Sequence, residues 1–461
     1  PTMMADRSLS SSFVLGLLVG VLGVGAVGAQ PASPSAGGDT LTADEAARRA
    51  LAENPTIQAA RQRRTAAAAS VREARSEWFP VVQGQARYRR LSDNVDYTVD
   101  LPSIPGGEDQ PVTFAPAILN RYSARASVEQ PVFTGFRIPN RLAAARARTK
   151  AARAEVRAHE NDAAYRARAA YWRLHEAQAR ASAAEEGLRQ LERRLVDVRN
   201  RRAAGQATEA DALRVRARRD QVRVEQIRAR NEVESARRTL NDRMGRPLDA
   251  PVVLADTVTV DSSGHEPSRL VEEAKNRRPD LEALRQTMQA RAAEVDVAQS
   301  GWYPQVALTG SYLYARPNEQ LFPPEERFQG TWEAGVRLSW RLSTGGGTDA
   351  ATDRARARRL QAQYELQDRR RAVAVAVKKQ VQTVEQARQA VRAAETSLRS
   401  ARAADRSVQS RAEQGMVVVS DLLEAERALR TARADLAAAQ ADYALARAAL
   451  DRALGRAPTS R

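Results

Sequence analysis

The residues with the clearest potential for chemistry are two carboxylates, Asp421 and Glu424, near the start of the last helical stretch. Residues three apart lie on one face of a helix, so both side chains can point in the same direction. Such a pair could attract cations, as rings of acidic side chains do in pores. It could equally be a solvated acidic face that interacts favourably with the dipole at the helix N-terminus. The residues alone leave both interpretations open.

Catalytic chemistry is not expected. The chain has no cysteine, which excludes disulfides and thiolate metal sites, and its three histidines lack metal-ligand spacing (His159, His175 and His265). The sequence contains no nucleophile–base–acid set and no glycine-rich phosphate loop. We therefore predict no enzyme activity, no metal site and no cofactor.

The composition favours long helices over a thick globular core. The 461 residues include only 5% aromatics, and the formal net charge is +17. A strongly basic chain is one indication of a nucleic-acid-binding protein. Arginines on the solvated faces of long helices explain the charge without one, and the sequence carries no RNA- or DNA-binding motif. We therefore predict no nucleic-acid partner.

The N-terminus resembles an export signal. Arg7 precedes the apolar run Phe13–Val27, and small residues lead up to Gln30, the pattern of a secretory signal peptide. We expect a signal peptide over residues 1–29 and a flexible leader over residues 30–41; a membrane anchor is the alternative. Since no other stretch approaches the ~18 apolar residues of a membrane helix, any bilayer crossing must use strands.

The acidic pair belongs to a stretch whose apolar residues recur every seven positions, with an alanine three residues after each. This a/d seam predicts a coiled coil. The same spacing precedes it over residues 377–401, so we expect a long antiparallel hairpin with its tip near Gly415. The seam residues are Leu422, Leu429, Leu436, Tyr443 and Leu450, with Ala425, Ala432, Ala439, Ala446 and Ala453.

Two segments instead alternate apolar and polar residues with a period of two, which predicts strand hairpins. Each strand has about ten residues, with aromatics near the ends of the apolar face, as in outer-membrane barrels. A half-buried soluble hairpin alternates equally well. In the second hairpin we predict a lipid-facing set consisting of Trp332, Val336, Leu338 and Trp340.

The chain is a tandem duplication. Trp78-Phe79-Pro80 returns as Trp302-Tyr303-Pro304, and Gly205, Asp211 and Gly245 return 210 residues later as Gly415, Asp421 and Gly455. The offset is 224 residues before the strand loops and 210 residues after them, because these loops are 14 residues shorter the second time, and a register kept on both sides over some 200 residues indicates an internal repeat. We place the first repeat at 42–245 (strands about 81–132, coiled-coil hairpin about 138–245), an irregular linker at 246–267, the second repeat at 268–455 (strands about 305–342, coiled-coil hairpin about 347–455) and a tail at 456–461.

The predicted fold class is therefore mainly α with membrane β: duplicated long helical hairpins plus four strands per chain. Four strands cannot close a barrel, and open strand edges are not tolerated in lipid. Two or three chains pooling their strands would close one. The helices would then continue the barrel as a tube.

This order of elements resembles the TolC-type outer-membrane efflux channels over nearly the whole chain, from about Thr42 to Gly455. The most specific matches are the paired tips, Arg201-x3-Gly205-x5-Asp211 and Arg411-x3-Gly415-x5-Asp421. The resemblance implies a homotrimer with a twelve-stranded barrel in the outer membrane of a Gram-negative-type bacterium, continued by a helical tunnel into the periplasm. It also implies docking of a periplasmic adaptor onto the tips and coupling to an inner-membrane pump.

The resemblance also assigns roles at the tips. Asp421 and Glu424 would form acidic rings at the entrance constriction, and Asp211 would belong to the contacts that hold the gate closed. The positions that pair with Asp211 in some relatives are Ala412 and Val417 here, so that lock is missing. The alternative candidates for gate contacts are Arg201, Arg202 and Arg411. The candidate docking residues at the tips are Gly205, Gly415, Met416, Val417 and Val418, unless the tips pack against each other.

The function that follows from the resemblance is an exit duct of a tripartite efflux or type I secretion system. A periplasmic adaptor is the first alternative, but it would show one hairpin flanked by β-rich domains. A structural coiled-coil protein is the second, but it leaves the alternating strands unexplained. The transported substrate cannot be read from the sequence.

Overall fold

The computed structural model describes residues 40–92, 97–101, 110–115, 118–261, 266–414 and 416–456. The expected signal peptide, most of the expected leader, Gly415 and residues 457–461 lie outside these ranges. The described residues belong to one compact unit that begins at Thr40.

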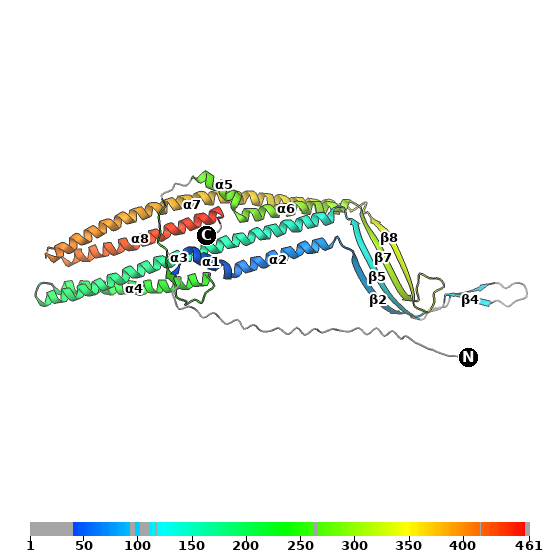
Figure 1. The fold of residues 1–461 in the computed structure, drawn as a ribbon, viewed down its shortest axis with the longest axis horizontal. Coiled ribbons are helices and arrows are strands. Elements are labelled where there is room, and N and C mark those ends of the chain that lie inside the picture. The colour runs from blue at the N-terminus through cyan, green and yellow to red at the C-terminus, as the bar shows by residue number, and fades with distance from the viewer. Residues whose placement is uncertain are drawn as a thin grey trace, which may run out of the picture. The chain divides into compact units, whose positions relative to one another are not determined.

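The helices follow the duplicated order that the sequence predicts (Figure 1). The first set comprises α1 (Ala43–Glu53), α2 (Pro55–Ser76), α3 (Arg137–Ala203) and α4 (Glu209–Arg243). The second set comprises α5 (Pro267–Arg277), α6 (Pro279–Gln299), α7 (Gly347–Glu413) and α8 (Val419–Leu454), with a short 3-10 turn at Ser300–Trp302 between α6 and the strands.

Local sequence explains where these helices begin and end. The Thr42 side chain accepts a hydrogen bond from the backbone N–H of Glu45, so it caps α1. Asn54 caps α2 in the same way, with Pro55 in the first helical position, where a missing N–H costs nothing. At its other end α8 stops at Gly455, which adopts the left-handed conformation that glycine tolerates best.

The predicted heptad seam is the contact surface of the α7–α8 hairpin. Leu422, Leu429, Tyr443 and Leu450 are buried, and Leu436 is half-buried. On α7 the facing residues are buried as well: Val377, Val384, Val391 and Leu398. The two helices therefore pack along the predicted seam.

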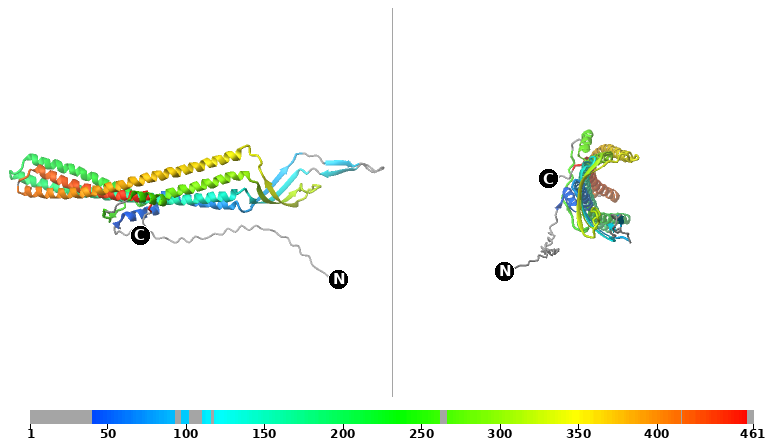
Figure 2. Two further views of the ribbon diagram at one scale, coloured as in Figure 1. Left: turned by 90° about the horizontal axis from the view of Figure 1, so that it is seen from above. Right: turned by 90° about the vertical axis from the view of Figure 1, so that its right-hand side faces the viewer.

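The helices form a layer in which α3 is central and α7 lies at one edge. Near the strands the order is α2–α3–α6–α7; towards the hairpin tips it is α4–α3–α8–α7 (Figures 1 and 2). The edge helices expose large apolar side chains, Tyr364 and Val375 on α7 and Leu213 and Ile227 on α4. Apolar side chains exposed at both edges are typical of a surface that another chain covers.

The strands continue this layer as a four-stranded antiparallel sheet of order β2–β5–β7–β8. These strands are β2 (Val81–Arg90), β5 (Asn120–Phe133), β7 (Gln305–Arg316) and β8 (Gln329–Ser339). Each leads into or out of the helix in the same place of the layer, so β2 and β8 are the sheet edges just as α2 and α7 are the helix edges. The predicted combination of helical hairpins and a membrane-type sheet is confirmed.

Two further pairings were not predicted. Part of the expected loop at 93–120 forms an antiparallel ribbon of β3 (Tyr97–Leu101) and β4 (Gln110–Ala115). The end of the expected leader, β1 (Thr40–Leu41), pairs in parallel with β6 (Val253–Leu254) in the expected irregular linker. Among the described helices, none is both long and apolar enough to cross a membrane.

Candidate functional site

The two hairpin tips have the same backbone design. In the first tip the N–H of Gln206 donates to the carbonyl of Arg201 over 2.7 Å, and in the second the N–H of Met416 donates to Arg411 over 3.0 Å. Gly205 adopts a φ of +72° to make its turn. Gly415, its counterpart, lies outside the described residues. The duplication therefore extends to the hydrogen bonds that close each tip.

The helices that follow the tips begin differently, and this difference separates the two duplicated aspartates. Thr208 and Asp211 form a reciprocal capping box at the start of α4, with the Thr208 Oγ1 to Asp211 Oδ2 distance at 2.6 Å. Hydrogen bonds from the Thr208 side chain and backbone lower the pKa of the Asp211 carboxyl. The equivalent cap position of α8 is Val418, which has no side-chain acceptor.

Asp421 is consequently not held by a capping box. Its carboxylate accepts a long hydrogen bond, 3.4 Å, from the hydroxyl of neighbouring Ser420. Asp421 and Glu424 are both exposed on the first turns of α8. The structure thus places the predicted acidic pair together at the tip, with both carboxylates accessible.

A hollow of about 500 Å³ separates the two hairpins behind the tips. Asp211 lines it opposite Ala412 and Val417, the two positions expected to face it, together with Arg194 and Arg201. Among the residues that the structure describes, no ion pair connects Asp211 to the second hairpin. Two of the three candidate arginines are engaged elsewhere, because Arg202 lies 3.8 Å from Glu209 and Arg411 donates to the carbonyl of Ser407. Arg201 lines the hollow.

The apolar run at the second tip divides between two environments. Met416 and Val418 are exposed, at 64% and 63% of their surface, whereas Val417 is half-buried against the hollow. Val419 packs with Leu195, Val198 and Val215 of the first hairpin. Met416 and Val418 therefore expose apolar surface at this tip, whereas Val419 packs against the first hairpin.

A buried charged contact between the hairpins was not predicted. Arg194 of α3 and Glu426 of α8 are 3.3 Å apart, and Glu426 has 11% of its side chain exposed. Burial raises the pKa of the Glu426 carboxyl, an effect that Arg194 partly offsets and that Asp405 of α7 reinforces. The heptad pattern identifies the seam but not the polar residues beside it, so sequence spacing gave no signal for this contact.

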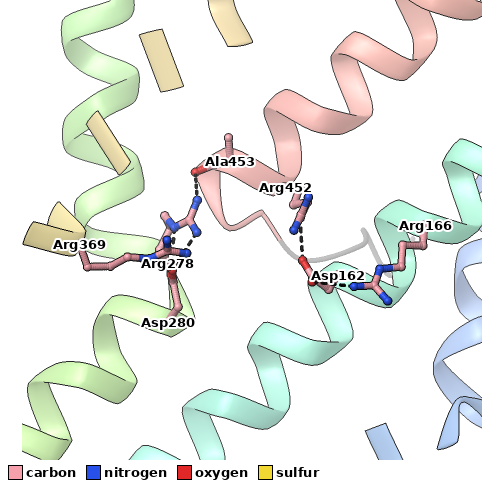
Figure 3. A network of polar contacts seen from close by, with 7 residues as sticks. All are labelled: Asp162, Arg166, Arg278, Asp280, Arg369, Arg452 and Ala453. Atoms are coloured by element: carbon pink, nitrogen blue, oxygen red, sulfur yellow. Dashed lines mark hydrogen bonds and ion pairs between the residues drawn. The ribbon is translucent and has the colours of Figure 1, made fainter. Parts of the chain in front are cut away.

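A second unpredicted network of ion pairs lies where α8 ends (Figure 3). Arg278 binds the Asp280 carboxylate through two nitrogens and donates to the carbonyl of Ala453, while Arg369 of α7 binds the same carboxylate. Burial alone would raise the pKa of Asp280, but the two arginines outweigh it and lower the pKa. Nearby, Arg452 binds Asp162 of α3 at 2.6 Å. These ion pairs fix the ends of α6 and α8 against the long helices.

The sheet has one apolar and one polar face. Trp332, Val336, Leu338 and Trp340 project from the apolar face with 56–77% of their surface exposed. The polar face carries charged and hydroxyl side chains from all four strands. Exposed apolar residues in this number are the arrangement that lipid stabilises and water does not.

The comparisons with known proteins agree with this architecture. A sequence model of the family described as "Outer membrane efflux protein" matches residues 46–246 and 270–456, which is most of both repeats. The chain belongs to this family, whose members are efflux channels and not enzymes.

Individual relatives are distant. The alkaline protease secretion protein AprF of Pseudomonas aeruginosa is 28% identical over 53% of this chain and 51% of its own length. The outer membrane protein TolC of Vibrio cholerae is 25% identical over 57% of this chain and 60% of its own. The chain thus spans only about half to three-fifths of these two relatives in sequence.

The structural match is more extensive. The outer membrane protein VceC of Vibrio cholerae superimposes with a TM-score of 0.72, covering 90% of this chain and 96% of that one at 18% identity. At this identity the similarity establishes the fold alone.

Proposed function

We propose that the protein is the outer-membrane exit duct of a tripartite efflux or type I secretion system, assembled from three copies. The observation that carries the proposal is that the sheet and the helical layer are open at matching edges. β2 and β8 present unpaired backbone at the two sides of a sheet whose apolar face is exposed. Open edges of this kind are not stable in lipid, so a membrane location requires further copies to pair with them.

The helical layer supports the same assembly. Its edges lie above the sheet edges, and each exposes apolar side chains, with Tyr364 and Val375 on one side and Leu213 and Ile227 on the other. Copies joined at β2 and β8 would also cover these helix faces. Three copies would give a twelve-stranded barrel continued by a tube of helices.

The tips would form the entrance of the duct. In a threefold assembly Asp421 and Glu424 would each be repeated three times around the axis, giving two acidic rings that attract cations. Met416 and Val418 would offer the apolar contact for a periplasmic adaptor, which would connect the duct to an inner-membrane pump. Arg201 and Arg411 would lie beside the gate without contributing an ion pair to Asp211.

Conductance tests the proposal. Full-length protein reconstituted into planar lipid bilayers should give discrete current steps, and replacing Asp421 and Glu424 with alanine should lower the potassium-to-chloride permeability ratio. Glu209→Ala is the control, because Glu209 is an exposed acidic residue at the other tip. The absence of any conductance would contradict the duct. Equal effects of all the substitutions would contradict the acidic entrance.

A further inference from the structure

The polar face of the sheet is strongly basic. Strand register assigns alternate residues to this face, opposite the side of Trp332. Its charged residues within the four strands are five arginines and two glutamates, namely Arg87, Arg89, Arg121, Arg125 and Arg337 with Glu129 and Glu333. Each chain therefore contributes an excess of three positive charges to this face.

Both glutamates are already paired with arginines. Arg337 of β8 binds Glu129 of β5 at 3.0 Å, and Arg125 of β5 lies 3.6 Å from Glu333 of β8. The hydroxyl of Ser311 on the intervening β7 donates to Glu333 over 2.8 Å. These contacts reach across β7, and they pair both strand glutamates of the face with arginines.

The remaining arginines gather on the β2 side. Arg89 and Arg121 lie directly opposite each other on β2 and β5, a pairing of like charges that is unfavourable unless an anion lies between them. Glu319, from the loop after β7, supplies it: it lies 3.7 Å from Arg89 and also pairs with Arg121. Including this carboxylate, the face keeps an excess of two positive charges per chain. Arg87 is exposed two residue pairs further into the sheet, opposite Ser123.

We infer that the strand section of the duct has a cationic wall that favours anionic solutes over cations. The inference rests on the proposed function, in which this face lines the lumen. With an excess of two positive charges per chain, a threefold repeat would place six uncompensated positive charges around one water-filled section. Arginine rings select for anions in pores, and low-dielectric walls strengthen the effect.

The acidic pair at the tips does not cancel this wall. α3, which runs from the sheet to the first tip, has 67 residues and a length of about 100 Å. The Debye length is only about 10 Å at 0.1 M salt. The two ends of the duct are therefore electrostatically independent, and the strand section selects by its own charge.

The experiment uses a substitution and a control at two arginines of β2 that lie on opposite faces of the sheet. Arg87→Gln removes a charge from the polar face, and Arg90→Gln removes the same charge from the opposite face. Arg87→Lys keeps the charge at the first position. All other charges of the chain are the same in the three variants. Full-length proteins are reconstituted in planar bilayers, and the reversal potential is measured across a KCl gradient at about 0.1 M.

We expect Arg87→Gln to lower the chloride-to-potassium permeability ratio on the order of twofold, and the difference to shrink near 1 M salt, where screening is stronger. Arg87→Lys and Arg90→Gln should both match the unsubstituted protein. The inference of a cationic wall would be wrong if Arg87→Gln left the permeability ratio unchanged or if Arg90→Gln lowered it equally. Neither result would contradict the proposed duct. A failure of every protein to conduct would contradict the duct itself.

Discussion

Asp280 offers the most direct test of how the helices of the second repeat are held together. Its carboxylate accepts hydrogen bonds of 2.9 and 2.8 Å from Arg278 and of 2.9 Å from Arg369, and Arg278 in turn holds the last turn of α8 through Ala453. Replacing Asp280 with asparagine keeps the shape and removes the charge. Both guanidinium groups would then lose their charge-assisted partner at the start of α6.

The loss of stability expected for this substitution follows from the burial of the Asp280, Arg278 and Arg369 side chains. Breaking a buried ion pair typically costs about 3–5 kcal/mol. Here the Asp280 side chain is 23% exposed and that of Arg369 is 48% exposed, so solvent reduces the loss. We therefore expect about 2 kcal/mol of local stability to disappear, which corresponds to about 30-fold faster opening.

Hydrogen exchange read by mass spectrometry measures this opening at the first turn of α6 and the last turn of α8. Asp296→Asn is the control, an exposed aspartate on the same helix, for which we expect a change within about 0.5 kcal/mol. Because the folded pKa of Asp280 lies below its ordinary value of 3.8, its contribution is present above that pH and is lost as the pH falls through the folded pKa. Less than a threefold change at pH 7, or an equal change in Asp296→Asn, would refute the reasoning.

Three further predictions concern other contacts. Gly135 and Gly345 are repeat-related and both have positive φ, but an added Cβ at Gly135 would lie 2.7 Å from Tyr303, whereas nothing lies within 4 Å at Gly345. Gly345→Ala should therefore lower the free energy of unfolding by about 1 kcal/mol, and Gly135→Ala should lower it by about 2 kcal/mol more. The thermal midpoint of unfolding in detergent should be lower for Gly135→Ala than for Gly345→Ala. Equal midpoints would contradict close packing of Gly135 against Tyr303. Val418→Thr should supply the side-chain cap that α8 lacks and stabilise its first turn by about 1 kcal/mol, which would slow hydrogen exchange there. Unchanged exchange would show that the backbone N–H groups of this turn already have hydrogen-bond partners. The raised pKa of Glu426 means that its packed state binds a proton more tightly, so protection of the contact between the hairpins should be greatest below its ordinary pKa of 4.5 and decline as the pH rises through the folded value. Glu426→Gln should remove this dependence, and a dependence that persists in the variant would exclude Glu426 as its source.

The sequence predicts the features that repeat regularly. Seven-residue spacing located the α7–α8 seam, because buried positions such as Leu422 and Leu450 must recur whenever the helices face each other. Alternation located the four long strands, and the duplicated Gly–Asp tips located both hairpin ends. The exposed positions of Asp421 and Glu424 likewise follow from their place in the first turns of α8.

The sequence does not predict contacts between residues far apart that belong to no pattern. Arg194 and Glu426 are 232 residues apart, and neither lies on the heptad seam, so only the packed hairpins bring them together. The two-residue β1–β6 pairing is too short to show alternation. The β3–β4 ribbon lies within a segment rich in proline, glycine and aspartate, where turn signals outweighed strand signals. The difference between Thr208 and Val418 could have been found by comparing the two repeats position by position, since it is a change in one capping residue.

The central claim is that the open edges of sheet and helices are closed by two further copies of the same chain. The mass of the protein extracted in detergent from the outer-membrane fraction, measured by light scattering with the detergent contribution subtracted, tests it most directly. We expect a particle of about 150 kDa of protein, three times the chain mass of 50.5 kDa. A monomer recovered without detergent would contradict it, because the exposed edges and the apolar sheet face would then be stable in water.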